Sequence, residues 1–192
     1  NNTAVGHNAL DANTTGTLNT AVGKDALGSN TTASSNTAVG REAMRDNTTG
    51  TNNISMGVSA LSTNTTASSN TALGTAALRR NTTGPSNTAV GHQAMDSNTT
   101  GFENVASGYR ALYNNTSGET NTAIGTEALR DNQTADNNTA VGKSALMSNT
   151  TGELNTAVGR GALDASTTAE YNVAVGKDAG STLTTGSYIA VL

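Results

Sequence analysis

The 192-residue chain has no cysteine, no tryptophan and a single proline, Pro85. Without cysteine it can form neither a disulfide framework nor a thiolate metal site. Aromatic residues make up 3% of the chain and hydrophobic residues 34%, which is too little for an ordinary globular core. No apolar stretch approaches the roughly 20 residues that a membrane-spanning helix requires. These absences exclude a disulfide-stapled domain and a helical membrane protein.

Charge is scarce as well. Charged residues make up 12% of the chain and the net charge is −4, so we expect contact with neither nucleic acid nor membrane. Such a polar chain could be disordered, but disordered chains are usually rich in charge and proline. Asn, Thr, Gly and Ala dominate instead, and they recur in a strict order. This combination indicates a repetitive fold held together by backbone hydrogen bonds and small side chains.

The order is a 17-residue repeat that runs through the chain in eleven copies without insertion or deletion. Its consensus is N-T-A-V-G-x-x-A-L-x-x-N-T-T-G-x-x, and the first Asn is position 0. Coils begin at Asn2, Asn19, Asn36 and every 17 residues thereafter. The period is too short for helical hairpin repeats of about 34–47 residues and suits stacked β-coils. We predict one all-β unit over residues 1–192, a parallel β-roll of eleven coils, and expect it to be a fragment of a longer fibrous protein.

Comparison of the copies predicts which columns are buried. Asn at position 0, Gly at position 4 and Ala at position 7 never change, whereas positions 5, 6, 9 and 10 vary freely and are expected to face water. Position 1 is always β-branched in the eleven copies, so positions 0 to 4 predict a strand. Side chains alternate along a strand, so positions 0, 2 and 4 share one face and positions 1 and 3 the other. Position 2 is almost always Ala, whereas position 3 accepts several sizes, so we place Ala inside a narrow roll and positions 1 and 3 outside. Glycine at position 4 indicates a backbone conformation that other residues disfavour.

The outward column is aliphatic, and a contiguous apolar column of this length marks an interface. In coil seven the apolar residue is at position 1 and Ser107 is at position 3, so the apolar group stays on the same face. We predict a homo-oligomer that shares this face. The predicted inter-chain residues are Val5, Val22, Val39, Met56, Leu73, Val90, Val105, Ile124, Val141, Val158 and Val175.

Two parts of the repeat remain to be assigned. Positions 5 to 10 contain stretches such as residues 41–46, R-E-A-M-R-D, which favour one short helical turn per coil, with a second strand as the alternative. Positions 11 to 14, N-T-T-G, predict a turn in which stacked Asn and Thr form side-chain ladders. Position 14 is Gly in seven copies and Ala in four, so it should not need a glycine-only conformation.

Candidate chemical groups are few. His7 and His92 both stand at position 5, five coils apart, which is too far for a shared catalytic or metal site. Calcium-loop and phosphate-binding motifs are absent, so we expect no metal, no cofactor and no enzymatic activity. The N-T-T triplets, for example at Asn13 and Asn30, are formal glycosylation acceptors, but the turn explains their recurrence better.

Three of the five aromatic residues fall in coils six and seven: Phe102, Tyr109 and Tyr113. Exposed aromatic side chains can anchor a ligand such as a glycan, so we name these three residues as a candidate ligand patch. Ordinary variation on a tolerant surface is the alternative reading.

The N-T-A-V-G and A-L elements resemble the head repeats of YadA-like trimeric autotransporter adhesins, whose strands read S-V-A-I-G. With N-T-T-G between these elements, the longer form is similar to repeats in bacterial and phage tail-fibre-like surface proteins. The resemblance covers the whole chain, although the adhesin heads usually have a shorter period. It implies a left-handed β-roll, an obligate homotrimer, an extracellular place on a cell or virion surface, and attachment to a surface receptor or glycan.

The predicted function is therefore a structural and adhesive segment of a trimeric fibre. An alternative is ice binding, because positions 12 and 13 are each Thr in ten copies. Against it, adjacent Thr residues point to opposite sides of an extended chain. A glycan-degrading solenoid enzyme would need a pair of carboxylic acids in a cleft, which the sequence does not suggest.

Overall fold

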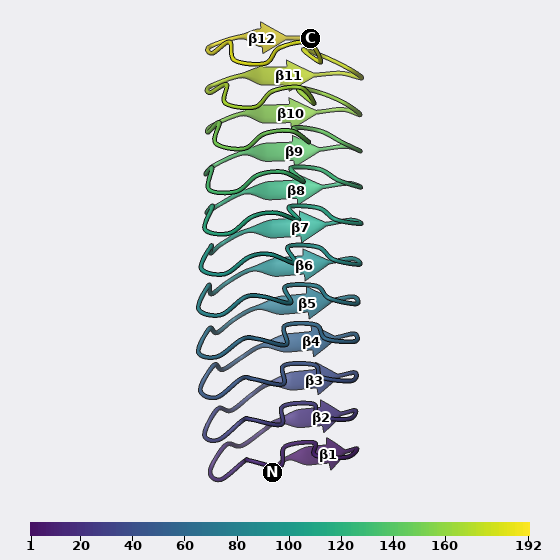
Figure 1. The fold of residues 1–192 in the computed structure, drawn as a ribbon, viewed down its shortest axis with the longest axis vertical. Helices are drawn as coiled ribbons and strands as arrows, with labels where there is room; N and C mark the ends of the chain where they lie inside the picture. Colours follow the sequence, from purple (N-terminus) through teal and green to yellow (C-terminus); the bar gives the residue numbers. More distant parts are fainter.

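A computed structural model describes all 192 residues as a rod of stacked coils, with the two termini at opposite ends (Figure 1). Each coil contributes one short strand, and consecutive strands pair in parallel to form a single twelve-stranded sheet. The register is fixed by the repeat, since Ala72 lies opposite Ala89 and the neighbouring pairs follow the same 17-residue offset. The predicted all-β solenoid of 17-residue coils is confirmed. The strands are β1 (Thr3–Val5), β2 (Thr20–Val22), β3 (Thr37–Val39), β4 (Ile54–Met56), β5 (Thr71–Leu73), β6 (Thr88–Val90), β7 (Val105–Ser107), β8 (Thr122–Ile124), β9 (Thr139–Val141), β10 (Thr156–Val158), β11 (Val173–Val175) and β12 (Ala190–Val191).

The strands are short because the backbone turns sharply at both ends. In β6, the Thr88 N–H donates to Asn104 O over 2.9 Å, and the Gly91 N–H donates to Leu73 O over 2.8 Å, so the strand is bonded to both neighbours. The position 4 glycines that follow have φ between 131° and 141°, a region that side chains exclude. The prediction for these glycines is confirmed.

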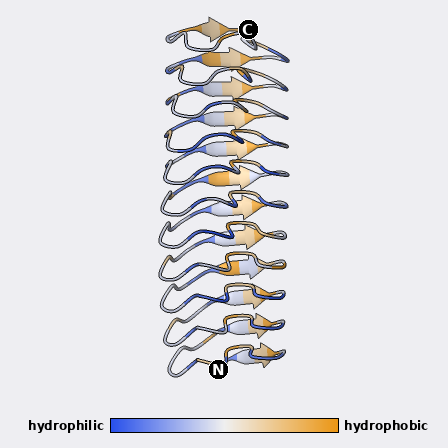
Figure 2. Cartoon of the chain, in the orientation of Figure 1, coloured by the Kyte–Doolittle hydropathy of each residue, from blue (hydrophilic) through white to orange (hydrophobic).

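The interior of the rod is a continuous stack of small and aliphatic side chains. Ala89, Ala94 and Met95, at positions 2, 7 and 8 of one coil, are all 0% exposed, and 29 such residues form one cluster. The predicted placement of both alanine columns inside a narrow roll is confirmed. Positions 1 and 3 lie outside, and the hydrophobic ends of the strands are stacked along the rod (Figure 2).

Two columns of asparagine are buried beside the apolar core. At position 0, the Asn104 Oδ1 accepts from the backbone N–H of Asn121 over 2.9 Å, and its Nδ2 donates to Gly118 O over 2.8 Å. At position 11, the Asn98 Nδ2 donates to Asn81 Oδ1 over 2.8 Å and to Gly101 O over 2.9 Å. The Asn side-chain ladder predicted at position 11 is confirmed, whereas the Thr hydroxyls of position 12 donate to backbone carbonyls instead of to one another. The Asn columns satisfy backbone groups of the turns that the short sheet cannot reach.

Positions 5 to 10 form neither a helix nor a second strand, so both sequence-based alternatives were wrong. The backbone there is a series of turns in which positions 6 and 8 have positive φ, as at Glu127 (57°) and Leu129 (50°). A right-handed helix requires negative φ at every residue, so these two positions prevent one.

Among the elements of the structure there is no helix whose length and apolar character would let it span a membrane.

Candidate functional site

The strand face, defined as the side chains at positions 1 and 3 of β1 to β11, is the most extensive candidate site. Its aliphatic residues remain accessible, with Val5 58% exposed, Met56 46% and Ile124 43%. Leu73 and three of the valines at position 3 are half-buried between their neighbours. All eleven predicted inter-chain residues lie on this face, with Val105 in the adjacent position 1 column.

The chemistry of the strand face is uniform. None of the residues at positions 1 and 3 is charged, and most coils present one hydroxyl and one aliphatic side chain. In coil seven the two are exchanged, because Val105 and Ser107 replace the usual Thr and Val. A long uncharged face with an apolar stripe is suited to another protein surface rather than to a small charged ligand. It holds no nucleophile beside a base.

The three aromatic residues predicted as a ligand patch are only partly brought together. The Arg110 guanidinium carbon lies 5.2 Å from the ring centroid of Tyr109 and 5.2 Å from that of Tyr113. The His92 ring stacks on Tyr109 with centroids 5.7 Å apart. Phe102 precedes β7, whereas Tyr109 follows it, so the strand separates the two. His92 and Arg110 were not predicted to belong to this cluster, although the 17-residue spacing of His92 and Tyr109 was a signal.

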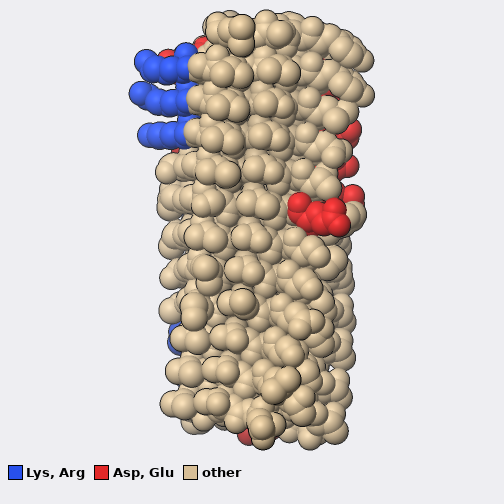
Figure 3. All heavy atoms as spheres, turned by 180° about the vertical axis from the view of Figure 1, so that it is seen from behind, with Lys and Arg blue, Asp and Glu red and all other residues tan.

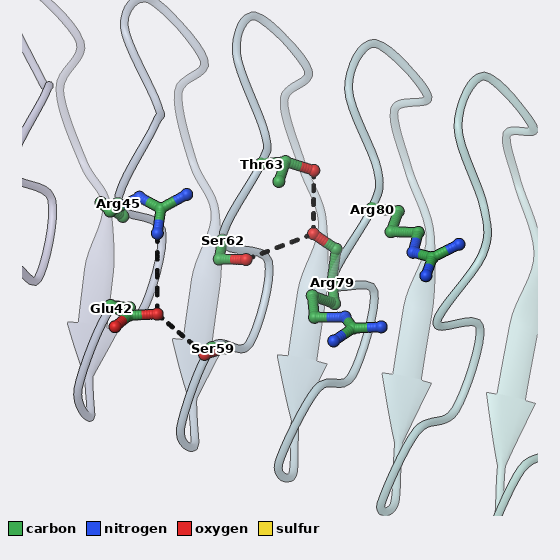
Figure 4. A pocket seen from close by; sticks show the side chains of 7 residues that line it. All are labelled: Glu42, Arg45, Ser59, Ser62, Thr63, Arg79 and Arg80. Atoms are coloured by element: carbon green, nitrogen blue, oxygen red, sulfur yellow. Dashed lines mark hydrogen bonds and ion pairs between the residues drawn. The ribbon is translucent and has the colours of Figure 1, made fainter.

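A shallow depression of about 350 Å³ lies over positions 6, 9 and 10 of coils three to five (Figure 4). Its polar groups are already engaged with one another. Arg45 lies 3.6 Å from Glu42, and the Ser59 hydroxyl donates to Glu42 over 3.2 Å. The lining residues are Glu42, Arg45, Ser59, Ser62, Thr63, Arg79 and Arg80. With a single carboxylate among them, they lack the paired acids of a glycosidase.

Nearby charges form local ion pairs. The Asp96 side chain is 0% exposed and accepts from Arg79 Nη2 over 2.9 Å. The Arg130 guanidinium donates to Asp131 and lowers the pKa of that carboxyl, and the same contact raises the pKa of Arg130. Arg45 has a raised pKa because it donates to Asp46. These pairs lie within one coil or between adjacent coils. The exposed ones contribute little to stability, whereas the buried Asp96 carboxylate depends on its arginine partner. No group of three or more His, Asp or Glu side chains could hold a metal ion.

The two threonine columns at positions 12 and 13 both lie on the outside of the rod. The segment bends there, so the expectation that adjacent Thr residues point to opposite sides was wrong. At position 12 the Thr99 hydroxyl donates to Thr116 O over 2.9 Å, and the same bond recurs along the column. At position 13 the hydroxyls, such as that of Thr100, are exposed and make no hydrogen bond within the chain.

A second depression, of about 450 Å³, is lined by the polar side chains of positions 10 and 12 in coils five to eight.

Comparisons with models of protein families, with curated proteins and with solved structures found no match to the chain. The strand face remains the largest surface whose chemistry points to one kind of partner.

Proposed function

We propose that this chain is a structural and adhesive segment of an extracellular homotrimeric fibre, such as an adhesin head or a tail fibre, in which three copies cover one another's strand faces. The observation that supports the proposal is the row of aliphatic side chains on one uncharged face, which are exposed or half-buried in every coil. Burial of each such side chain contributes about 1–2 kcal/mol. Summed along eleven coils, this exceeds the cost of associating the chains.

The resemblance to trimeric adhesin repeats supports three copies, and a closed cyclic arrangement uses the same face of each copy. The left-handed winding implied by that resemblance belongs to the same proposal. In such a fibre the rod holds binding groups away from the surface that carries it. The freely varying positions 5, 6, 9 and 10 lie outside the core, so they can change to fit a receptor or glycan without altering the fold.

Static light scattering of the 192-residue chain tests this proposal. We expect a molar mass three times the 19.2 kDa of one chain. Ile124→Glu together with Val141→Glu should lower the mass, because both changes would place a carboxylate in the shared face. The matched control is Thr134→Glu with Thr151→Glu, at position 13 of the same two coils, which should keep the mass. A folded wild-type chain that stays monomeric at high concentration would exclude the proposal.

Ice binding is a second candidate, favoured by the exposed threonine hydroxyls of position 13. They recur at the strand spacing of about 4.8 Å and are not used within the chain. Thermal hysteresis tests this function directly. Activity that is lost in Thr83→Lys with Thr100→Lys, and kept in Ile124→Glu with Val141→Glu, would assign ice binding to this column. A concentrated wild-type solution without thermal hysteresis would remove the candidate.

A further inference from the structure

The strand face is bordered by two charged columns in the last coils. Position 15 lies three residues before a strand, and in four successive coils it is acidic: Glu119, Asp136, Glu153 and Glu170. Position 5 lies two residues after a strand, and in three successive coils it is basic: Lys143, Arg160 and Lys177. We call these columns the acidic edge and the basic edge. Each of β9, β10 and β11 has an acid on one side and a base on the other.

The two edges are on opposite sides of the rod. Seen from behind, Lys and Arg are stacked on one side near the C-terminal end, and Asp and Glu line the other side (Figure 3). Lys143 and Arg160 are exposed and form no ion pair within the chain, whereas Lys177 reaches only its neighbour Asp178, over 3.3 Å. The acidic edge takes part in no ion pair. Along its column the Glu119 N–H donates to Asp136 Oδ1, and the Glu170 N–H donates to the Ser187 hydroxyl.

Each edge is unfavourable in an isolated chain. In-register parallel strands place the side chains of one column at the strand spacing of about 4.8 Å, and like charges at that distance repel one another. The interior does not require these charges, because the same positions hold Thr17, Ser34 and Thr75 in other coils. An oppositely charged surface with the same spacing would relieve this repulsion, and the chain itself carries such a surface on its other edge.

We infer that the acidic edge of one copy binds the basic edge of the next, with rods parallel and equivalent coils at the same height. A rotation axis parallel to the rod brings the left edge of one strand face to the right edge of its neighbour without changing the height. Asp136, Glu153 and Glu170 then face Lys143, Arg160 and Lys177 of the partner subunit. This inference rests on the proposed assembly and adds its direction and register.

Antiparallel rods do not give this match. Inverting one rod about an axis along the strands would place the acidic edge opposite Thr17, Ser34 and Thr51 of the first coils. If each parallel rod were shifted along its axis by one coil relative to the next, three ion pairs would remain. The rods would then form an open helical array rather than a closed ring. Closed symmetry and charge together select the parallel arrangement without a shift.

The aromatic residues of coils six and seven support the same register independently of charge. Phe102 occupies position 15 and Tyr109 occupies position 5, so the two flank β7 as the acids and bases flank β9 to β11. Tyr109 is 43% exposed and Phe102 is half-buried. In the parallel arrangement Phe102 meets Tyr109 of the partner subunit, and both rings lose contact with water.

Charge reversal tests the inference. The acid-reversed variant carries Asp136→Lys, Glu153→Lys and Glu170→Lys, which places a base on both sides of β9, β10 and β11. We expect its assembly, measured by sedimentation, to be about 100-fold weaker or more at low salt. A swapped variant adds Lys143→Glu, Arg160→Glu and Lys177→Glu, which makes the edges complementary again, so its assembly should return. The control variant changes the net charge by the same amount at three positions that lie on neither edge: Asp11→Lys, Asp46→Lys and Asp164→Lys. It should assemble like wild type.

The outcomes separate this inference from the proposed function. If the wild-type chain is monomeric, both are wrong. If it assembles and the folded acid-reversed variant assembles equally well, the edges do not meet and only this inference fails. Circular dichroism verifies that each variant keeps its β-structure. If the acid-reversed variant loses that structure, the swapped variant is the test. A folded swapped variant that assembles supports the inference, and one that stays monomeric overturns it.

Discussion

Position 4 of the repeat accepts only glycine because two constraints coincide there. Gly91 has φ of 132°, and a Cβ on it would lie 2.5 Å from the carbonyl oxygen of Gly108 in the next coil. The other position 4 glycines that have a following full coil show the same close approach. The invariance of this column is therefore a consequence of coil stacking rather than of ligand binding.

Replacing Gly91 with alanine should destabilise the rod by about 2–5 kcal/mol, because the change adds backbone strain and a steric overlap. Gly28→Ala is the matched control, since its φ is not positive and the nearest atom to a new Cβ is 3.4 Å away. The control should be neutral or slightly stabilising. Urea unfolding followed by circular dichroism measures both. Equal unfolding midpoints for the two variants would refute the steric explanation.

The Asn ladder at position 11 ends at coil ten, where Ser166 replaces asparagine. The Asn149 Oδ1 and the Ser166 Oγ are both buried and have no hydrogen-bond partner. In earlier coils the next Asn supplies an Nδ2 donor to this oxygen, as Asn149 does to Asn132 Oδ1 over 3.1 Å. The shorter serine side chain does not make this contact.

Ser166→Asn should extend the ladder by one coil and stabilise the chain by about 1 kcal/mol. The new amide would donate to the unpaired Asn149 Oδ1. Ser166→Ala is the control: it removes a hydroxyl that makes no bond, and it should leave stability nearly unchanged. Thermal unfolding compares the two variants with wild type. A Ser166→Asn chain that melts no higher than Ser166→Ala would contradict this role of the ladder.

Within each coil, the turns depend on residues that have a left-handed backbone conformation although they are not glycine. All 33 residues at positions 6, 8 and 16 have positive φ, comprising 31 non-glycine residues together with Gly161 and Gly180. Thr120 is the only β-branched residue among them, although Thr and Val are common elsewhere in the chain. β-branched side chains are strongly disfavoured in this conformation. This explains why the buried column at position 8 contains Leu and Met but never Ile or Val.

Leu129→Ile should therefore cost about 2–3 kcal/mol although the two side chains are isomers, because isoleucine adds strain at φ of 50°. Leu129→Met should cost less than about 1.5 kcal/mol, since methionine already occupies the equivalent positions Met44 and Met95. The difference between the two unfolding free energies in denaturant is the relevant quantity. An isoleucine variant as stable as the methionine variant would show that backbone strain does not select this column.

The strand and its sidedness could be predicted because comparison of the eleven copies separates fixed from variable columns. The turns could not be predicted in the same way. Residues such as Glu127, Ala128 and Leu129 favour a helical turn locally, but coil stacking imposes left-handed backbone on two of these three. The absence of β-branched residues at positions 6 and 8 was the signal available in the sequence. The outward position of both Thr columns was missed because the N-T-T segment bends rather than extends.

For the whole molecule, the repeat makes each coil rest on its two neighbours, so the apolar core forms one cluster along the rod, and the Asn ladder at position 11 runs beside it as far as coil nine. The strand face also runs along the whole rod, with its charged edges confined to the last coils, and its aliphatic side chains are not covered by the chain itself. The candidate ligand patch of Phe102, Tyr109 and Tyr113 is divided by this geometry. Phe102 and Tyr109 border the face, whereas Tyr113 packs against Arg110 away from it.

Cross-linking of single-cysteine chains tests the parallel assembly most directly, because the natural chain has no cysteine. Chains with Glu153→Cys are refolded together with chains that carry Arg160→Cys, and a short bis-maleimide linker is added. We predict covalent dimers of the two kinds of chain, since both sites border β10 at the same height. The comparison mixture pairs Glu153→Cys with Lys24→Cys beside β2, and it should give none. Dimers in the second mixture, or in neither, would contradict parallel rods that share their strand faces.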